Sequence, residues 1–172
     1  QQMLEEAVAE VKDSGEVQDG GWSPQIAVGT AVMIPESYVP DLQLRLALYR
    51  RLGDLENTDE IDAFGAELID RFGPLPEEVK HLLKIVFIKA LCRKANVEKL
   101  DAGPKGVVIH FRKREFSNPV GLVQFIGEQG SLAKIRPDHS VVFVRDWPTA
   151  EKRLAGSAVV MTQLARLAEK AA

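Results

Sequence analysis

The chain has 172 residues, 45% of them hydrophobic, which suits one domain of ordinary size with a sizeable core and excludes a wholly disordered polypeptide. Its net charge of −3 is unevenly divided, because residues 1–79 hold 17 acidic and 5 basic side chains whereas residues 80–172 hold 8 and 17. This asymmetry predicts either charge pairing between the halves of one fold or two partners of opposite charge.

The N-terminal part resembles an arm joined to a domain. Residues 1–13 have apolar side chains at helical spacing, and residues 14–24 form a polar, glycine-rich connector. Because the chain opens without methionine in the middle of a helical pattern, we expect residues 1–13 to continue from a preceding module of a longer polypeptide. The domain proper is then 25–172, and it begins with an extended segment at 26–34, which is rich in β-branched residues.

Two helices follow. Residues 41–52 alternate in a way that would suit a strand, but their apolar side chains also share one helical face, so a helix is predicted. The next helix, 58–72, has a clear start: Asn57 can cap it, and Glu60 can return a hydrogen bond to the capping residue. Its apolar stripe ends where Gly73 provides a stop.

The remaining pattern adds a buried helix and a small sheet. A third helix, about 76–96, is apolar around most of its circumference and should be the central one. The elements predicted after it are strands at 97–102 and 106–111, a helix at 119–130, a hairpin of 132–136 with 141–145, and a helix at 149–170. The fold class is therefore α+β: a layer of three consecutive helices packed with a small, mainly antiparallel sheet, plus an N-terminal helical arm and a C-terminal helix.

Signatures of catalysis are missing from the sequence. It contains no phosphate-binding loop, no nucleophile elbow and no histidine spacing typical of a metal site. Cys92, the single cysteine, lies in a long helix and is predicted to be a packed core thiol, which fits a reducing cytoplasm. No apolar run approaches the roughly 20 residues that cross a bilayer, and no secretory signal is visible. We expect a cytoplasmic, non-catalytic domain with no catalytic, cofactor-binding or metal-binding residue.

Acidic residues concentrate on the helix at 58–72. At about 100° per residue, with Ile61 at zero, Glu67 falls at about 240° and Asp70 at about 180°, both far from the apolar stripe. They form either a solvated face or a docking strip for an arginine- or lysine-rich surface, to which Asp59 and Glu60 could contribute. An enzyme that binds Mg²⁺ through these carboxylates is a further alternative, which requires them to converge in a cleft.

Basic residues cluster in the second half. Arg112, Lys113 and Arg114 continue a predicted strand into a turn, with Phe111 and Phe116 nearby. This arrangement suggests a nucleic-acid-binding accessory domain as the alternative function, although the chain has a pI of about 5.7 and no helix-turn-helix or RNA-binding signature.

Four strings resemble one family. Residues 34–41 (IPESYVPD), 46–52 (LALYRRL) and 67–77 (ELIDRFGPLPE) are similar, in order, to signatures in the C-terminal domain of bacterial transcription-repair coupling factors, and 2–7 (QMLEEA) resembles the helix that leads into that domain. The family consists of large ATP-driven DNA translocases that displace stalled RNA polymerase and recruit the damage detector UvrA in transcription-coupled nucleotide-excision repair.

The resemblance implies a regulatory role. The domain would pack against the N-terminal UvrB-like module of the same polypeptide and hide its UvrA-binding surface until RNA polymerase is engaged. Glu67 and Asp70 would face arginines of that module, which favours the docking-strip interpretation. The parent would use ATP and Mg²⁺ and would have UvrA, RNA polymerase and DNA as partners. Its ATPase motifs are absent from the 172 residues of this sequence. No membrane contact is expected.

Overall fold

The computed structural model describes residues 22–170, so the predicted helix at 1–13 and most of the connector at 14–24 lie outside the described residues. The described chain separates into two compact units. We call residues 31–87 the helical unit, and residues 24–30 together with 88–170 the sheet unit; the division falls inside helix α4. Among the described helices, none is both long and apolar enough to cross a membrane.

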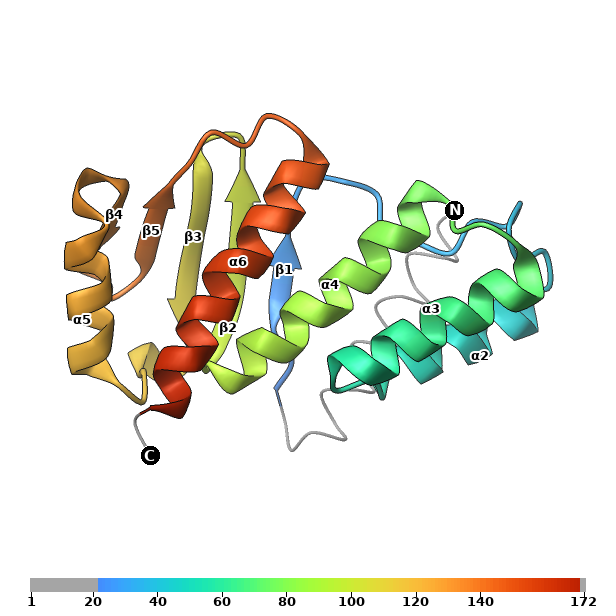
Figure 1. The fold of residues 1–172 in the computed structure, drawn as a ribbon, viewed down its shortest axis with the longest axis horizontal. Coiled ribbons are helices and arrows are strands. Elements are labelled where there is room, and N and C mark those ends of the chain that lie inside the picture. Colours follow the sequence, from blue (N-terminus) through green and yellow to red (C-terminus); the bar gives the residue numbers. More distant parts are fainter. Residues whose placement is uncertain (1–21, 171–172) are drawn as a thin grey trace. The chain divides into compact units, whose positions relative to one another are not determined.

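The helical unit contains the first three predicted helices. They are α2 (Leu42–Gly53), α3 (Thr58–Phe72) and the first part of α4 (Glu77–Lys94), drawn in Figure 1. The predicted helix at 41–52 is confirmed, and Asp41 caps it by accepting the N–H of Leu44 at 3.1 Å. Alternating leucines therefore did not produce a strand, because a capping residue and a shared apolar face favour the helix.

The start of α3 is confirmed with one correction. Asn57 accepts the N–H of Glu60 at 2.9 Å, as the capping pattern predicts. The Glu60 carboxylate, however, accepts the N–H of Glu56 at 2.9 Å and not that of Asn57. The carboxylate reaches one residue further back along the chain, so it still satisfies a backbone donor ahead of the helix.

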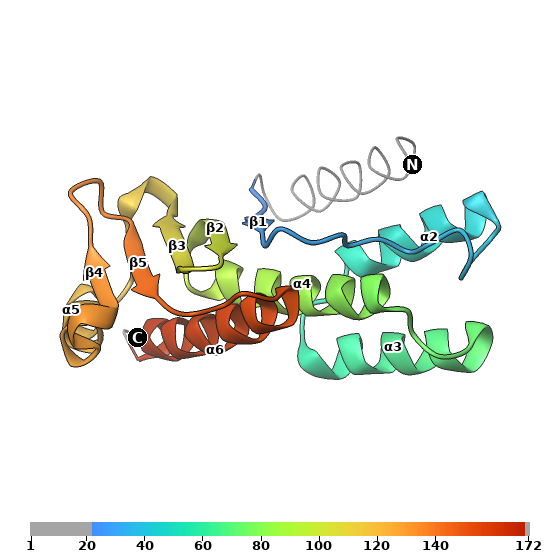
Figure 2. The ribbon, with the colours of Figure 1, turned by 90° about the horizontal axis from the view of Figure 1, so that it is seen from above.

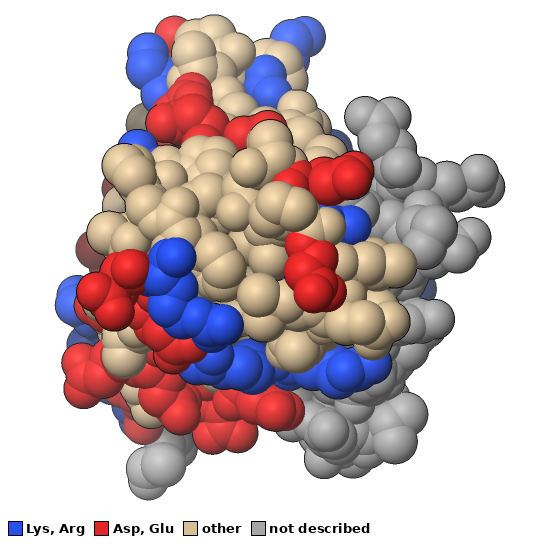
Figure 3. All heavy atoms as spheres, turned by 90° about the vertical axis from the view of Figure 1, so that its right-hand side faces the viewer, with Lys and Arg blue, Asp and Glu red and all other residues tan. Residues whose placement is uncertain are grey.

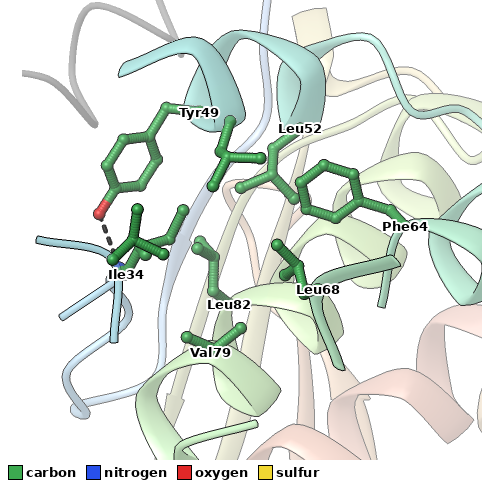
Figure 4. Close-up of a cluster of buried hydrophobic side chains, with 9 residues drawn as sticks. Ile34, Tyr49, Leu52, Phe64, Leu68, Val79 and Leu82 are labelled. Carbon is green, nitrogen blue, oxygen red and sulfur yellow. Dashed lines mark hydrogen bonds between the residues drawn. The ribbon is translucent and has the colours of Figure 1, made fainter. Parts of the chain in front are cut away.

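The core of the helical unit is a cluster of side chains from all three helices and from the segment before α2. Figure 4 draws its members as sticks around one apolar centre and labels seven of them. The full cluster consists of Ile34, Val39, Leu48, Tyr49, Leu52, Phe64, Leu68, Val79 and Leu82. The predicted stripe of α3 thus faces inward through Ile61, Phe64 and Leu68, and this leaves the opposite side of α3 to solvent.

Two tyrosine hydroxyls tie the segment before α2 to the helices. The Tyr49 hydroxyl accepts the buried N–H of Ile34 at 2.7 Å, the contact dashed in Figure 4. The Tyr38 hydroxyl donates toward the carbonyls of Gly73 at 2.8 Å and Leu68 at 3.1 Å, at the end of α3. These residues lie in the strings that carry the family resemblance, and their role here is structural.

Arg45 is a buried cation in the same unit, with 5% of its surface exposed. Its guanidinium donates to the carbonyls of Val39 at 2.7 Å and Pro40 at 2.9 Å. These bonds satisfy the carbonyls of two residues just ahead of the helix, so Arg45 holds the entry into α2.

The sheet unit is built on five strands in the order β1-β2-β3-β5-β4. Strand β1 runs parallel to β2, and the other neighbours are antiparallel, which confirms a small, mainly antiparallel sheet. The strands are β1 (Gln25–Ala27), β2 (Val97–Gly103), β3 (Gly106–Phe111), β4 (Ala133–Ile135) and β5 (Val141–Val144). The extended segment predicted at 26–34 is wrong in length: only three residues pair as a strand, and from residue 31 the chain belongs to the helical unit.

Helices cover one face of this sheet. Helix α6 (Ala150–Glu169) lies along that face in both ribbon views, and α5 (Pro119–Glu128) packs beside β4 (Figures 1 and 2). The alternation along β3 follows from this cover, since Val107 and Ile109 are buried whereas the intervening Val108 is half-buried. Short 3₁₀ turns at Arg112–Arg114 and Gly130–Leu132 complete the unit.

Candidate protein-interaction surface

The outward side of α3 carries the predicted docking strip. Asp59, Glu60, Asp62 and Asp70 are all exposed, and they follow one another along a helix whose apolar side is buried. They are therefore spread over a surface and not gathered in a cleft. Nothing in this arrangement supports the magnesium-enzyme alternative, which required the carboxylates to converge.

Asp70 presents a carboxylate that the described part of the chain leaves unpaired. Its side chain is exposed, near the C-terminal end of α3, and forms no hydrogen bond or ion pair with the described residues. The adjacent Ile69 has 50% of its surface exposed, which is high for a large apolar side chain. A charged and an apolar group thus stand side by side on the same end of the helix.

Glu67 differs, because its carboxylate is already bound. Arg51 of α2 donates to both of its oxygens, Nη1 to Oε2 at 2.6 Å and Nη2 to Oε1 at 2.7 Å. Arg71, one turn further along α3, donates to Oε2 at 3.1 Å. These bonds lower the pKa of Glu67 to about 2, mainly through the Arg51 contact. Of the two residues predicted to dock, Glu67 is thus ion-paired within the chain, whereas Asp70 has no such partner among the described residues.

The two arginines are themselves held by aromatic rings. The guanidinium carbon of Arg51 lies 4.8 Å from the centre of the Phe64 ring, and that of Arg71 lies 5.0 Å from the centre of the Phe72 ring. Stacking of this kind orients a planar guanidinium. The hydrogen bond to Glu67 raises the pKa of Arg51. The carboxylate and its two arginines form one ordered group with a net charge of +1, which we call the Glu67 triad.

Sequence reasoning missed Arg51 and could have found Arg71. Arg71 follows Glu67 by four positions on one helix, a spacing that places the two side chains together. Arg51 is 16 residues away on another helix, so only the packing of α2 against α3 reveals it. On the face drawn in Figure 3, basic side chains also lie directly beside acidic ones, so charges of both signs meet on that surface.

An apolar groove adjoins the strip within the helical unit. It lies between α3 and the first part of α4 and has a volume of about 470 Å³. Ile69, Leu83 and Phe87 line it, and Lys80 and Lys84 stand along its α4 side. A groove with apolar walls and charged edges is the form that a protein-binding surface takes.

The basic turn predicted for nucleic acid forms the 3₁₀ turn Arg112–Arg114 in the sheet unit. Lys113 and Arg114 are exposed and both have left-handed backbone, with φ of 58° at each. Asn96 holds this turn, since its side-chain amide donates to the carbonyls of Arg112 at 2.9 Å and Glu115 at 2.8 Å.

The turn borders a polar pocket of about 300 Å³ whose charges are mixed. Lys113 and Arg114 line it together with the carboxylates of Glu98 and Asp138. Ser140 donates to Asp138 through its hydroxyl at 2.6 Å and its N–H at 2.9 Å, and these bonds lower the pKa of Asp138. Two carboxylates beside Lys113 and Arg114 do not favour binding of a phosphate backbone, so nucleic-acid contact stays a prediction.

Comparison with known proteins decides the family. The TRCF domain model matches residues 28–122, which include the whole helical unit and with it all of α3. The chain belongs to the transcription-repair coupling factor family. The transcription-repair-coupling factor of Rickettsia typhi is 44% identical over 146 residues, which are 84% of this chain. That of Rickettsia conorii is 44% identical over 145 residues, again 84% of this chain.

The match concerns one part of these long relatives, since the aligned region makes up 13% of either Rickettsia protein. Among solved structures, a crystal structure of the C-terminal domain of a transcription-repair coupling factor aligns with a TM-score of 0.74. The alignment covers 87% of this chain and 96% of that one, at 19% sequence identity, so it establishes the fold. The predicted α+β class and the family assignment are both confirmed.

Proposed function

We propose that this chain is the autoinhibitory protein-interaction domain of a bacterial transcription-repair coupling factor. In the repressed state it packs against the N-terminal UvrB-like module of the same polypeptide and masks the surface that UvrA binds. Engagement of stalled RNA polymerase by the parent protein displaces the domain and uncovers that surface. The switch is then the opening of an interface between domains, a common basis for regulation.

The observation that carries this proposal is the outer end of α3. It combines the exposed carboxylate of Asp70, which no described residue pairs with, the half-exposed Ile69 and the adjoining groove. A carboxylate binds an arginine through short, charge-assisted hydrogen bonds, and an apolar neighbour excludes water from such a contact. This surface therefore suits a partner that offers arginines beside apolar side chains.

The parent protein supplies the activity in this scheme. It is proposed to be an ATP-dependent DNA translocase that uses ATP and Mg²⁺ outside these residues, with UvrA, RNA polymerase and DNA as its partners in transcription-coupled nucleotide-excision repair. The role of this domain is to restrain that activity by contact and not by chemistry.

The test uses the full-length parent protein with the double substitution Glu67→Ala and Asp70→Ala. We expect it to weaken the closed state and so to raise both UvrA binding and basal ATPase activity, because each charge-assisted contact contributes about 1.5–3 kcal/mol. Glu128→Ala, which removes an exposed carboxylate from α5, is the matched control and should change neither. A double variant that binds UvrA no better than the wild-type protein would show that the acidic strip does not hold the domain closed.

A further inference from the structure

The Glu67 triad leaves little room for a partner's cation on Glu67. A carboxylate has about four acceptor positions, and three N–H donors of Arg51 and Arg71 already point at this one. The shortest bonds come from Arg51, whose fork covers both oxygens. A guanidinium from another protein binds a carboxylate best through that same two-oxygen edge.

The net charge of the Glu67 triad also disfavours binding of a partner's cation to Glu67. Glu67 has a charge of −1 and its two arginines together have +2, so an approaching arginine meets a net positive group. The three side chains are partly exposed, Glu67 to 35% and Arg51 to 46%, so solvent weakens their mutual attraction without removing it. The triad can therefore exchange one arginine for another, but only by displacing one that is already bound.

The Asp70 carboxylate differs from that of Glu67 in its surroundings. It lies three positions beyond Glu67 on the same side of α3, and no arginine or lysine of the described chain holds it. An incoming arginine binds Asp70 without breaking an existing bond. The two carboxylates are neighbours, but an incoming arginine has to displace a bound arginine only at Glu67.

We propose that Arg51 is an internal competitor that determines the affinity of this surface: it occupies Glu67, so that docking of an arginine-bearing partner rests mainly on Asp70 and is weaker than two free carboxylates would make it. This inference rests on the proposed function and concerns how strongly the contact is held. Because Arg51 occupies Glu67, the interface is weaker than this surface would otherwise allow. A weaker interface suits a domain contact that has to open.

The experiment measures the affinity of this 172-residue chain for the isolated UvrB-like module by titration calorimetry. Arg51→Met retains an unbranched apolar stem but removes the guanidinium fork and the charge. We expect this variant to bind on the order of tenfold tighter, and Glu67→Gln alone to change the affinity by less than about twofold. Asp70→Asn should weaken binding on the order of tenfold.

The double variant Arg51→Met with Glu67→Gln separates competition from a general change in shape or charge. Because the freed carboxylate is gone, we expect most of the gain to disappear. Arg51→Lys retains the charge without the two-oxygen fork and should fall between the wild-type chain and Arg51→Met. Urea unfolding of each variant establishes that the compared chains are folded.

The outcomes separate this inference from the function on which it rests. If Arg51→Met binds no tighter while Asp70→Asn weakens binding, Arg51 is not a competitor and the docking surface still stands. If the gain persists in the double variant, it does not come through Glu67, and the inference is again wrong. If no variant and no wild-type chain binds the module, both the inference and the proposed function are overturned.

Discussion

Removal of the Tyr49 hydroxyl should destabilise the helical unit. In the Tyr49→Phe variant, the N–H of Ile34 loses its 2.7 Å acceptor at a position where no surface of Ile34 is exposed and only 1% of Tyr49 is. Water cannot take the place of the hydroxyl there. An unsatisfied buried donor costs about 1–3 kcal/mol, so the free energy of unfolding should fall by that amount.

The assay is urea unfolding followed by circular dichroism, with the wild-type slope expected in the variant because the packed surface is unchanged. In thermal unfolding, each kcal/mol should lower the midpoint by about 2–4 °C for a chain of this size. Tyr38→Phe is the matched control: its hydroxyl is only partly buried and serves carbonyls, which solvent reaches more easily. We expect a loss of about 0.5–1.5 kcal/mol for it.

The reasoning would be refuted if Tyr49→Phe lowered the free energy of unfolding by less than about 0.5 kcal/mol, or if Tyr38→Phe proved the more damaging change. Either result would mean that the segment before α2 is held by its apolar contacts alone. A confirmed loss, with unchanged partner binding by the folded fraction, would establish that the Tyr49 hydroxyl serves the fold and not recognition.

Three further predictions follow from particular contacts. Gly156 of α6 lies against the ring of Trp147, which precedes that helix, so the Cβ of Gly156→Ala would overlap the ring and should lower the free energy of unfolding by about 1–3 kcal/mol; an unchanged urea midpoint would contradict this packing. Cys92 is fully buried and burial raises its pKa to about 12, so alkylation of its thiol should be negligible in the native chain and rapid in denaturant. Stoichiometric labelling of the native chain at neutral pH would be inconsistent with a buried thiol. The pKa of Glu67 falls from its ordinary value of 4.5 to about 2, so its ion pairs stabilise the fold above pH 4.5 and lose that effect as the pH falls toward 2. The difference in urea midpoint between wild type and Glu67→Gln should therefore shrink on acidification. A constant difference would argue against the triad.

The elements that the sequence predicted well are those fixed by local chemistry. Asn57 marks the start of α3 and Gly73 its end, and both act as predicted because a cap depends only on residues within one turn. The turn between β2 and β3 is of the same kind. Gly106 sits there with a φ of 131°, a conformation that a residue with a side chain rarely adopts.

The features that the sequence did not predict depend on contacts between distant residues. The stretch after Ala27 looks like a continuing strand, yet among the described strands β1 pairs only with β2. Ile34 instead lies in the core of the helical unit, where its N–H binds the Tyr49 hydroxyl. The pairing of β5 with β3 is equally non-local. For the docking strip, helical periodicity placed Asp70 correctly on the outside but gave no sign that Arg51 of another helix would cover Glu67.

The central claim is that the outer end of α3 docks on the UvrB-like module through an exposed carboxylate. The most direct test is the binding of this chain to that isolated module, with the wild-type chain and Asp70→Asn compared at two salt concentrations. The account predicts measurable binding by the wild-type chain, a loss on the order of tenfold for Asp70→Asn, and a smaller difference at high salt, where exposed charges are screened. Equal binding by the two chains at both salt concentrations would contradict it.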